Sequence, residues 1–84
     1  MTTNALKEAK VKTIGSKQTM KGVWAGRVAN VFLAEDAADY VVEPVRKICL
    51  EKGIPIIMVK TMSELGKACG IRKGAAAAGL LKEN

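Results

Sequence analysis

The chain has 84 residues, 49% of them hydrophobic, which is enough for one domain with one modest core and argues against two domains. Fourteen Lys and Arg residues against eight Asp and Glu residues give a formal net charge of +6. This excess favours a polyanionic partner, because Lys and Arg neutralise phosphates and release their counterions. A basic protein without such a partner is the alternative that charge alone leaves open.

The N-terminal third predicts two helices separated by a short extended piece. Residues 3–12 have the periodicity of a helix, and residues 13–14 are free to extend before a glycine. Ser16 is a suitable N-cap for a second helix, which runs through Ala25 and stops at Gly26.

The middle of the chain predicts strand, helix and strand. Residues 27–36 are rich in β-favouring side chains. A helix follows, which we expect to start near Val41 or Val42 so that Pro44 lies in its first turn, and to close at Gly53. The apolar run at residues 54–59 is typical of a strand that is covered on both faces.

The C-terminal third predicts a helix over "ELGKACG", which Ser63 caps, and then an ambiguous tail. In "GAAAAGLLK" the alanines favour a helix, whereas Gly74 and Gly79 oppose one. We interpret the tail as a strand, because an interior strand packed by helices can use small side chains. The alternation of elements predicts the α/β class, as a three-layer α/β/α sandwich with a small mixed four-stranded sheet.

The residues that most catalysis requires are scarce. The chain has no His, which removes the commonest general base and metal ligand, and it lacks both a P-loop and a GxGxxG motif. Cys49 and Cys69 have no zinc-type or CxxC spacing, so we expect both to be reduced and buried. We therefore expect no enzyme, no metal and no cofactor.

The N-terminus lacks the apolar core of a signal peptide, and no run of 18 apolar residues occurs. We accordingly expect a cytoplasmic protein without a membrane partner.

One stretch, "GSKQTMKGVWAGR" at residues 15–27, places polar and basic residues at a helix start. At 100° per residue, Lys17, Gln18 and Lys21 share one side of the helix, and Thr19, Met20 and Val23 share the opposite side. A glycine-led helix N-terminus attracts phosphate through unpaired amides, and an amide side chain can read a base edge. A solvated lysine face is the alternative reading.

A second basic element is "GIRKG" at residues 70–74, where Arg72 and Lys73 lie in a glycine-bounded loop. If the sheet brings this loop beside residues 15–21, the two segments form one continuous basic surface.

Two blocks, "IGSKQTMKGVWAGRVANVFLAEDA" and "GIPIIMVKTMSELGKACGIRKGAAAAGLL", resemble the kink-turn RNA-binding ribosomal protein family typified by archaeal L7Ae, especially its short bacterial members of the YbxF type. The similarity runs from about Leu6 to Leu81, and Gly66 and Gly70 match the family's glycines in the most specific block. It implies that the tail is the last strand, and that the whole chain is one RNA-binding domain.

In that family the glycine-led helix start meets tandem sheared G·A pairs beside a three-nucleotide bulge, and the loop before the last strand packs on the flipped-out bulge nucleotide. The resemblance therefore implies two groups of RNA-binding residues. The helix group is Gly15, Ser16, Lys17, Gln18 and Lys21, and the loop group is Ile71, Arg72 and Lys73.

The sequence departs from the family pattern in both groups. Archaeal and eukaryotic members usually carry Asn-Glu where this chain has Lys17 and Gln18. The bacterial members share the Lys-Gln form of this chain. Arg72 and Lys73 stand where relatives tend to have an acidic and an apolar residue. We expect looser reading of RNA shape and a steeper salt dependence.

Three further residues invite a functional reading. Trp24 and Tyr40 could stack on bases, but the chain lacks the interleaved aromatics of stacking platforms, so we expect both to cover the core margin. Asp36 is expected to be a loop or cap residue near the basic helix.

Together these observations predict non-catalytic recognition of kink-turn or kink-turn-like structured RNA, such as ribosomal RNA or an mRNA leader, by a monomer associated with the ribosome. The alternative is a small ribosomal structural or protein-interaction module that binds ribosomal RNA without reading a kink.

Overall fold

The structure, a computed structural model, describes residues 12–82, and one mixed sheet organises them. Three helices and four strands alternate along these residues. The elements are β1 (Lys12–Ile14), α2 (Ser16–Trp24), β2 (Val28–Ala34), α3 (Asp39–Lys52), β3 (Ile56–Val59), α4 (Met62–Cys69) and β4 (Ala77–Leu81). The helix expected over residues 3–12 lies outside the described residues, except that Lys12 opens β1.

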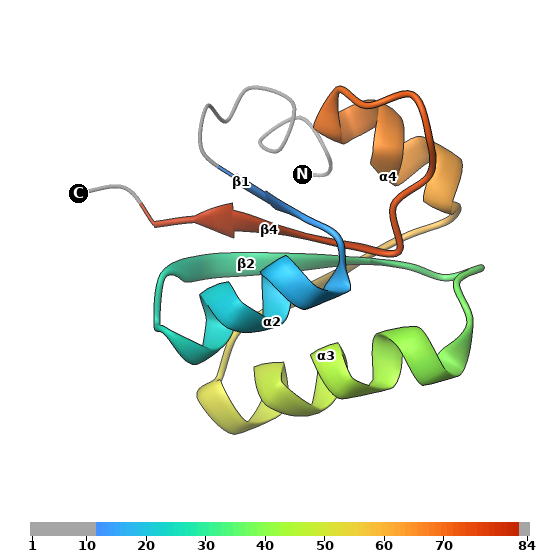
Figure 1. Cartoon of the computed structure of the whole chain (residues 1–84). Coiled ribbons are helices and arrows are strands. Elements are labelled where there is room, and N and C mark those ends of the chain that lie inside the picture. Colours follow the sequence, from blue (N-terminus) through green and yellow to red (C-terminus); the bar gives the residue numbers. More distant parts are fainter. Residues whose placement is uncertain (1–11, 83–84) are drawn as a thin grey trace.

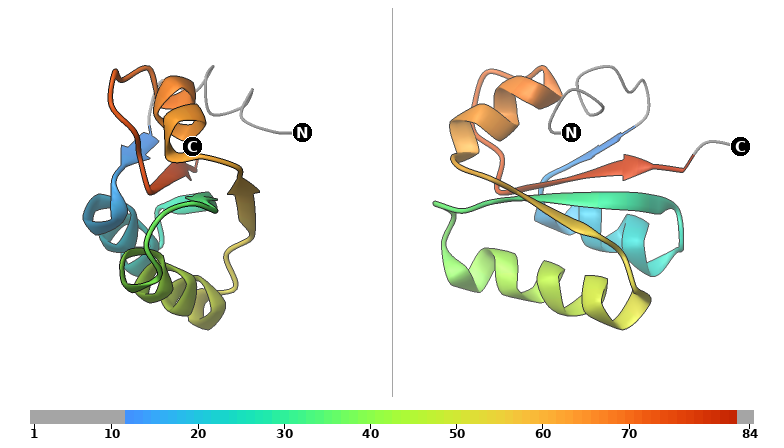
Figure 2. Two further views of the ribbon diagram at one scale, coloured as in Figure 1. Left: turned by 90° about the vertical axis from the view of Figure 1, so that its right-hand side faces the viewer. Right: turned by 180° about the vertical axis from the view of Figure 1, so that it is seen from behind.

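The strands lie in the order β1-β4-β2-β3. β4 is antiparallel to both of its neighbours, and β3 is parallel to β2. Helices α2 and α3 cover one face of the sheet and α4 covers the other (Figures 1 and 2). The predicted three-layer α/β/α arrangement with a mixed four-stranded sheet is therefore confirmed.

The alanine-rich tail forms an interior strand, as predicted. Ala77 and Ala78 are completely buried between the helical layers. A Cβ atom added at Gly79 would lie only 2.6 Å from the Thr13 hydroxyl oxygen on β1. Small side chains fill residues 77–79 of β4, where neighbouring elements pack closely, and this burial outweighs the helix propensity of alanine.

Two expectations for the middle of the chain were wrong. β3 is an edge strand and Met58 is 43% exposed, so this strand is not covered on both faces. Helix α3 begins at Asp39, which places Pro44 beyond the first turn. Pro44 lies on the exposed side of the helix. Because proline has no N–H, the carbonyl four residues earlier receives no helical hydrogen bond and is left to solvent.

The predicted helix caps also differ from those observed. Ser16 is the first residue of α2 rather than its cap, and Gly15 occupies the cap position. Thr61, not Ser63, caps α4, because its hydroxyl oxygen accepts a 3.0 Å hydrogen bond from the amide of Glu64. Gly53 ends α3 in the left-handed conformation, as expected.

The core lies on both faces of the sheet, and β2 contributes Val31, Phe32 and Leu33 to it, which are at most 1% exposed. Cys49 and Cys69 are buried free thiols, as predicted. Burial raises the pKa of both thiols, and Lys12 partly offsets the rise in the pKa of Cys69. Within residues 12–82, no helix has the length and apolarity needed to span a membrane.

Candidate nucleic-acid interface

The turn between β1 and α2 is held by a contact with the far end of the sequence. Gly15 adopts a φ of +98°, a conformation that side chains disfavour. Its N–H donates a 2.8 Å hydrogen bond to the carbonyl of Ala77, and its own carbonyl accepts from Thr19 at 3.0 Å. The amide of Gly15 thus forms a hydrogen bond within the fold. No atom lies within 4 Å of the position that a Cβ atom of this residue would take.

Helix α2 has the two faces that its sequence predicts. Thr19 and Val23 are completely buried, whereas Lys17, Gln18 and Lys21 are exposed. The first turn contains no acidic residue, and no side chain caps it. The first-turn N–H groups after Gly15 have no acceptor within the helix, so they add positive potential to that of the two lysines.

Two close contacts hold α2 against the sheet. The hydroxyls of Thr13 on β1 and Thr19 on α2 are 2.9 Å apart and hydrogen-bonded. A Cβ atom added at Gly22 would lie 2.7 Å from a methyl group of Val28 on β2. The orientation of the exposed lysine face is therefore set by packing on the opposite side of the helix.

The predicted basic loop, residues 70–74, follows α4. Gly70 ends the helix in the left-handed conformation, and the amide of Ile71 donates to the carbonyl of Gly66 at 3.0 Å. Ile71 is partly buried against the core, whereas Arg72 and Lys73 are exposed. Gly66 allows the carbonyl of Lys73 to lie directly on α4, where an added Cβ would overlap it.

The fold places both predicted segments at the same end of the molecule. The chain leaving α4 runs down the right-hand side of Figure 1 to β4, beside the turn that starts α2. The left view of Figure 2 looks directly at this end and shows both segments on it. The hydrogen bond from Gly15 to Ala77 joins the start of α2 to the first residue of β4, the strand that follows the basic loop.

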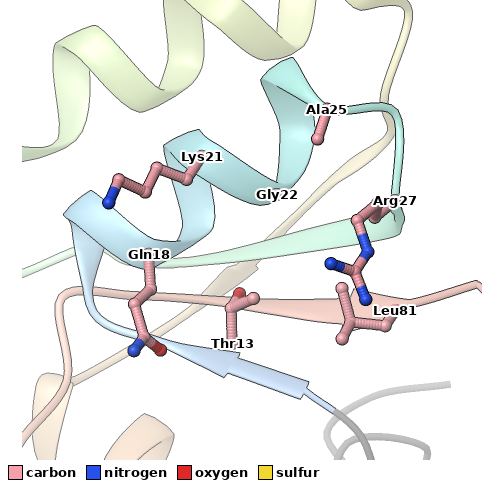
Figure 3. A pocket seen from close by; sticks show the side chains of 7 residues that line it. All are labelled: Thr13, Gln18, Lys21, Gly22, Ala25, Arg27 and Leu81. Carbon is pink, nitrogen blue, oxygen red and sulfur yellow. The ribbon is translucent and has the colours of Figure 1, made fainter.

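A groove beside α2 extends this surface along the molecule. It has a volume of about 330 Å³. Gln18 and Thr13 lie toward one end of it, and the guanidinium of Arg27 lies beside Leu81 at the other (Figure 3). The remaining lining residues are Lys21, Gly22 and Ala25. Sequence reasoning missed Arg27, because Arg27 lies in the turn after α2 and no motif marks it.

The basic side chains of this end are not neutralised by acidic partners. One ion pair has both of its partners within residues 12–82, namely Arg46 with Glu43, at 3.4 Å within α3. Residues 12–82 contain no group of three or more acidic, Cys or His side chains arranged to hold a metal ion.

The structure places the two aromatic residues differently from the sequence expectation, and it confirms the expectation for Asp36 only in part. Trp24 is 66% exposed and lies under the ammonium of Lys52, 4.7 Å from the ring centroid. Tyr40 is 83% exposed, so it does not cover the core margin. Asp36 is a capping residue as expected, but it accepts from the amide of Met62 at 2.8 Å and so serves the start of α4 rather than the basic helix.

These features define a small α/β/α domain with exposed basic side chains at one end that form no ion pair within residues 12–82. Residues 2–84 match the Ribosomal protein L7Ae/L30e/S12e/Gadd45 family, and the chain belongs to this family.

Similar proteins agree with this membership. The chain is 48% identical over 67 residues to RNA-binding protein TTE2299 of Caldanaerobacter subterraneus subsp. tengcongensis, an alignment covering 80% of this chain and 82% of that one. It is 41% identical over 69 residues to RNA-binding protein YbxF of Geobacillus stearothermophilus, covering 82% and 84%. The Giardia lamblia 15.5kD RNA binding protein shares the fold, with a TM-score of 0.91, 24% identity, and coverage of 98% of this chain and 72% of that one.

Proposed function

We propose that this protein is a non-catalytic RNA-binding protein that recognises and stabilises kink-turn or kink-turn-like RNA. The observation that carries the proposal is the placement of two basic segments, residues 15–21 and 71–73, at one end of the fold. Family membership and the names of the relatives support RNA as the ligand.

The two segments have different roles in this proposal. Gly15 and Ser16 allow the RNA backbone to approach the start of α2, where Lys17 and Lys21 bind phosphates. Gln18 donates and accepts hydrogen bonds at base edges. Ile71, Arg72 and Lys73 contact the bulged side of the bend.

Binding stabilises the bent RNA because it neutralises phosphates that the bend brings close together. A free RNA rarely populates such a conformation, since its backbone charges repel one another. A protein that binds only the bent form shifts the population toward it. No covalent step is involved, and the proposed setting is a monomer on ribosomal RNA or an mRNA leader, in association with the ribosome.

Alanine substitutions test the site. Lys21→Ala and Gln18→Ala should each weaken binding to a kink-turn RNA by about 1–3 kcal/mol, measured by electrophoretic mobility shift or calorimetry. Lys47→Ala is the matched control, because Lys47 is exposed on α3 and lies opposite the buried Val45 on that helix. Affinities equal to that of the unsubstituted protein in both site variants would refute the assignment.

A second comparison distinguishes shape recognition from general RNA binding. A kink-turn RNA and a plain duplex of equal length carry similar charge, so only recognition of the bend gives a large affinity ratio. A ratio near one would favour the alternative of a ribosomal module that binds RNA without reading a kink.

A further inference from the structure

The groove between α2 and β1 continues away from the helix start toward Arg27. In Figure 3 the Gln18 side chain reaches down from α2 toward β1, and the Arg27 guanidinium lies at the opposite end of the groove beside Leu81. The end near Gln18 belongs to the surface that the proposed function already uses. The end near Arg27 has no role in that proposal.

Arg27 is held in place by its backbone. Its amide donates to the carbonyl of Gly22 at 2.9 Å, and its carbonyl accepts from the amide of Lys82 at 2.8 Å. These bonds join the turn after α2 to the end of β4, so the Cα position of Arg27 is fixed while its side chain remains exposed. When Arg27 binds an anion, its backbone is already ordered, so the remaining conformational cost is that of ordering its side chain.

The lining of the groove fits a polyanion with an apolar component. It combines the cations Lys21 and Arg27 with the apolar surfaces of Ala25 and Leu81, and it contains no acidic side chain. Arg27 takes part in no ion pair among residues 12–82. Gly22 lets α2 approach the sheet closely beside the groove, because a Cβ atom there would lie 2.7 Å from a methyl group of Val28. A volume of about 330 Å³ is at the lower end of the range for small-ligand sites, which is suitable for a short length of one strand.

We propose that this groove binds the sugar-phosphate backbone of an RNA strand that leaves the bend, with a phosphate held by the Arg27 guanidinium. This inference rests on the proposed function, which supplies the RNA, and it extends the interface from the helix start along α2. The Arg27 guanidinium donates paired hydrogen bonds to phosphate oxygens, and the apolar lining accommodates the sugar. Arg27 therefore contributes affinity for RNA flanking the bend without reading its sequence.

The test combines Arg27→Ala with single-phosphate neutralisation in the RNA. A methylphosphonate is placed at each position of the two strands flanking the bend of a kink-turn RNA, one position at a time. Binding to the full chain and to Arg27→Ala is measured for each RNA. Lys47→Ala removes one charge outside the groove and serves as the control, and thermal unfolding checks that each variant is folded.

We expect Arg27→Ala to weaken binding to the unmodified RNA about fivefold to tenfold and to reduce the slope of log affinity against log salt by about 0.7–0.9. One phosphate, or two adjacent ones, should show coupling: its neutralisation weakens binding to the unsubstituted protein but not to Arg27→Ala. Lys47→Ala should show no such position.

Two negative results have separate meanings. If Arg27→Ala and Lys47→Ala behave alike at every phosphate while Lys21→Ala weakens binding, the groove proposal is overturned and the proposed function stands. If neither Lys21→Ala nor Gln18→Ala weakens binding and a plain duplex binds equally well, the proposed function fails, and the groove proposal fails with it.

Discussion

Replacing Gly66 by Ala tests whether the contact between α4 and the basic loop determines how that loop is held. The new methyl group would overlap the carbonyl oxygen of Lys73 and come within 3.1 Å of the Gly74 Cα. Both atoms belong to the backbone, so no side-chain rotation can relieve the overlap. Overpacking of this kind costs up to about 3 kcal/mol, and the gain in helix propensity from Gly to Ala offsets about 1 kcal/mol. We expect a net destabilisation of about 2 kcal/mol.

Urea unfolding followed by circular dichroism measures this change, and Lys67→Ala is the control because Lys67 is exposed on the same helix. The amide chemical shifts of residues 71–74 should change in Gly66→Ala and not in the control. Because Arg72 and Lys73 lie in the displaced segment, RNA affinity should fall as well under the proposed function. A Gly66→Ala protein at least as stable as Lys67→Ala, with unchanged loop shifts, would refute the reasoning.

Three further predictions concern stability. Thr19→Val should lower the free energy of unfolding by about 1–3 kcal/mol, because it leaves the Thr13 hydroxyl without its partner. The double variant Thr13→Val/Thr19→Val should be closer in stability to the unsubstituted protein, and additive losses in chemical denaturation would contradict this. Asp36→Ala should lower the free energy of unfolding by about 1 kcal/mol, because the Met62 amide loses its acceptor. Asp36→Asn should lower it less, and thermal unfolding measures both changes. Burial raises the pKa of Cys49 above its ordinary 9.0, so the unfolded chain loses this proton first. The protonated Cys49 thiol therefore contributes stability below about pH 9, and this contribution is lost as the pH rises further. The free energy of unfolding, titrated at alkaline pH, should decline less steeply in Cys49→Ala.

The basic face of α2 could be predicted from the sequence because helical periodicity is a local property. Lys17 and Lys21 lie one turn apart, and Thr19 and Val23 are one turn apart on the other side, so the burial of one pair leaves the other exposed. The glycine-bounded loop with Arg72 and Lys73 was equally visible as a local pattern. Neither pattern indicates where the two segments lie relative to each other.

The errors fall where neighbours distant in sequence decide the outcome. Whether residues 56–59 lie at an edge or in the centre depends on strand pairing: β3 pairs with β2 alone, because β1 pairs with β4 instead. Asp36 faces α4 because the end of β2 lies beside the start of that helix in the folded chain, although the two are separated by α3 and β3. The cap of α4 is a separate, local error: the helix begins at Met62, so Thr61 rather than Ser63 stands at the cap position.

The amino-acid sequence by itself determined the α/β/α class, the polarity of each helix and the chemistry available for binding an anion. These properties follow from the order of apolar, polar and glycine residues over one or two turns. Only the tertiary structure decided that the start of α2 is bonded to the first residue of β4, through the hydrogen bond from Gly15 to Ala77, and that Arg27 lines a groove with Leu81. Contacts of this kind depend on strand order and close packing, which are properties of the whole fold and leave no signal in any short segment.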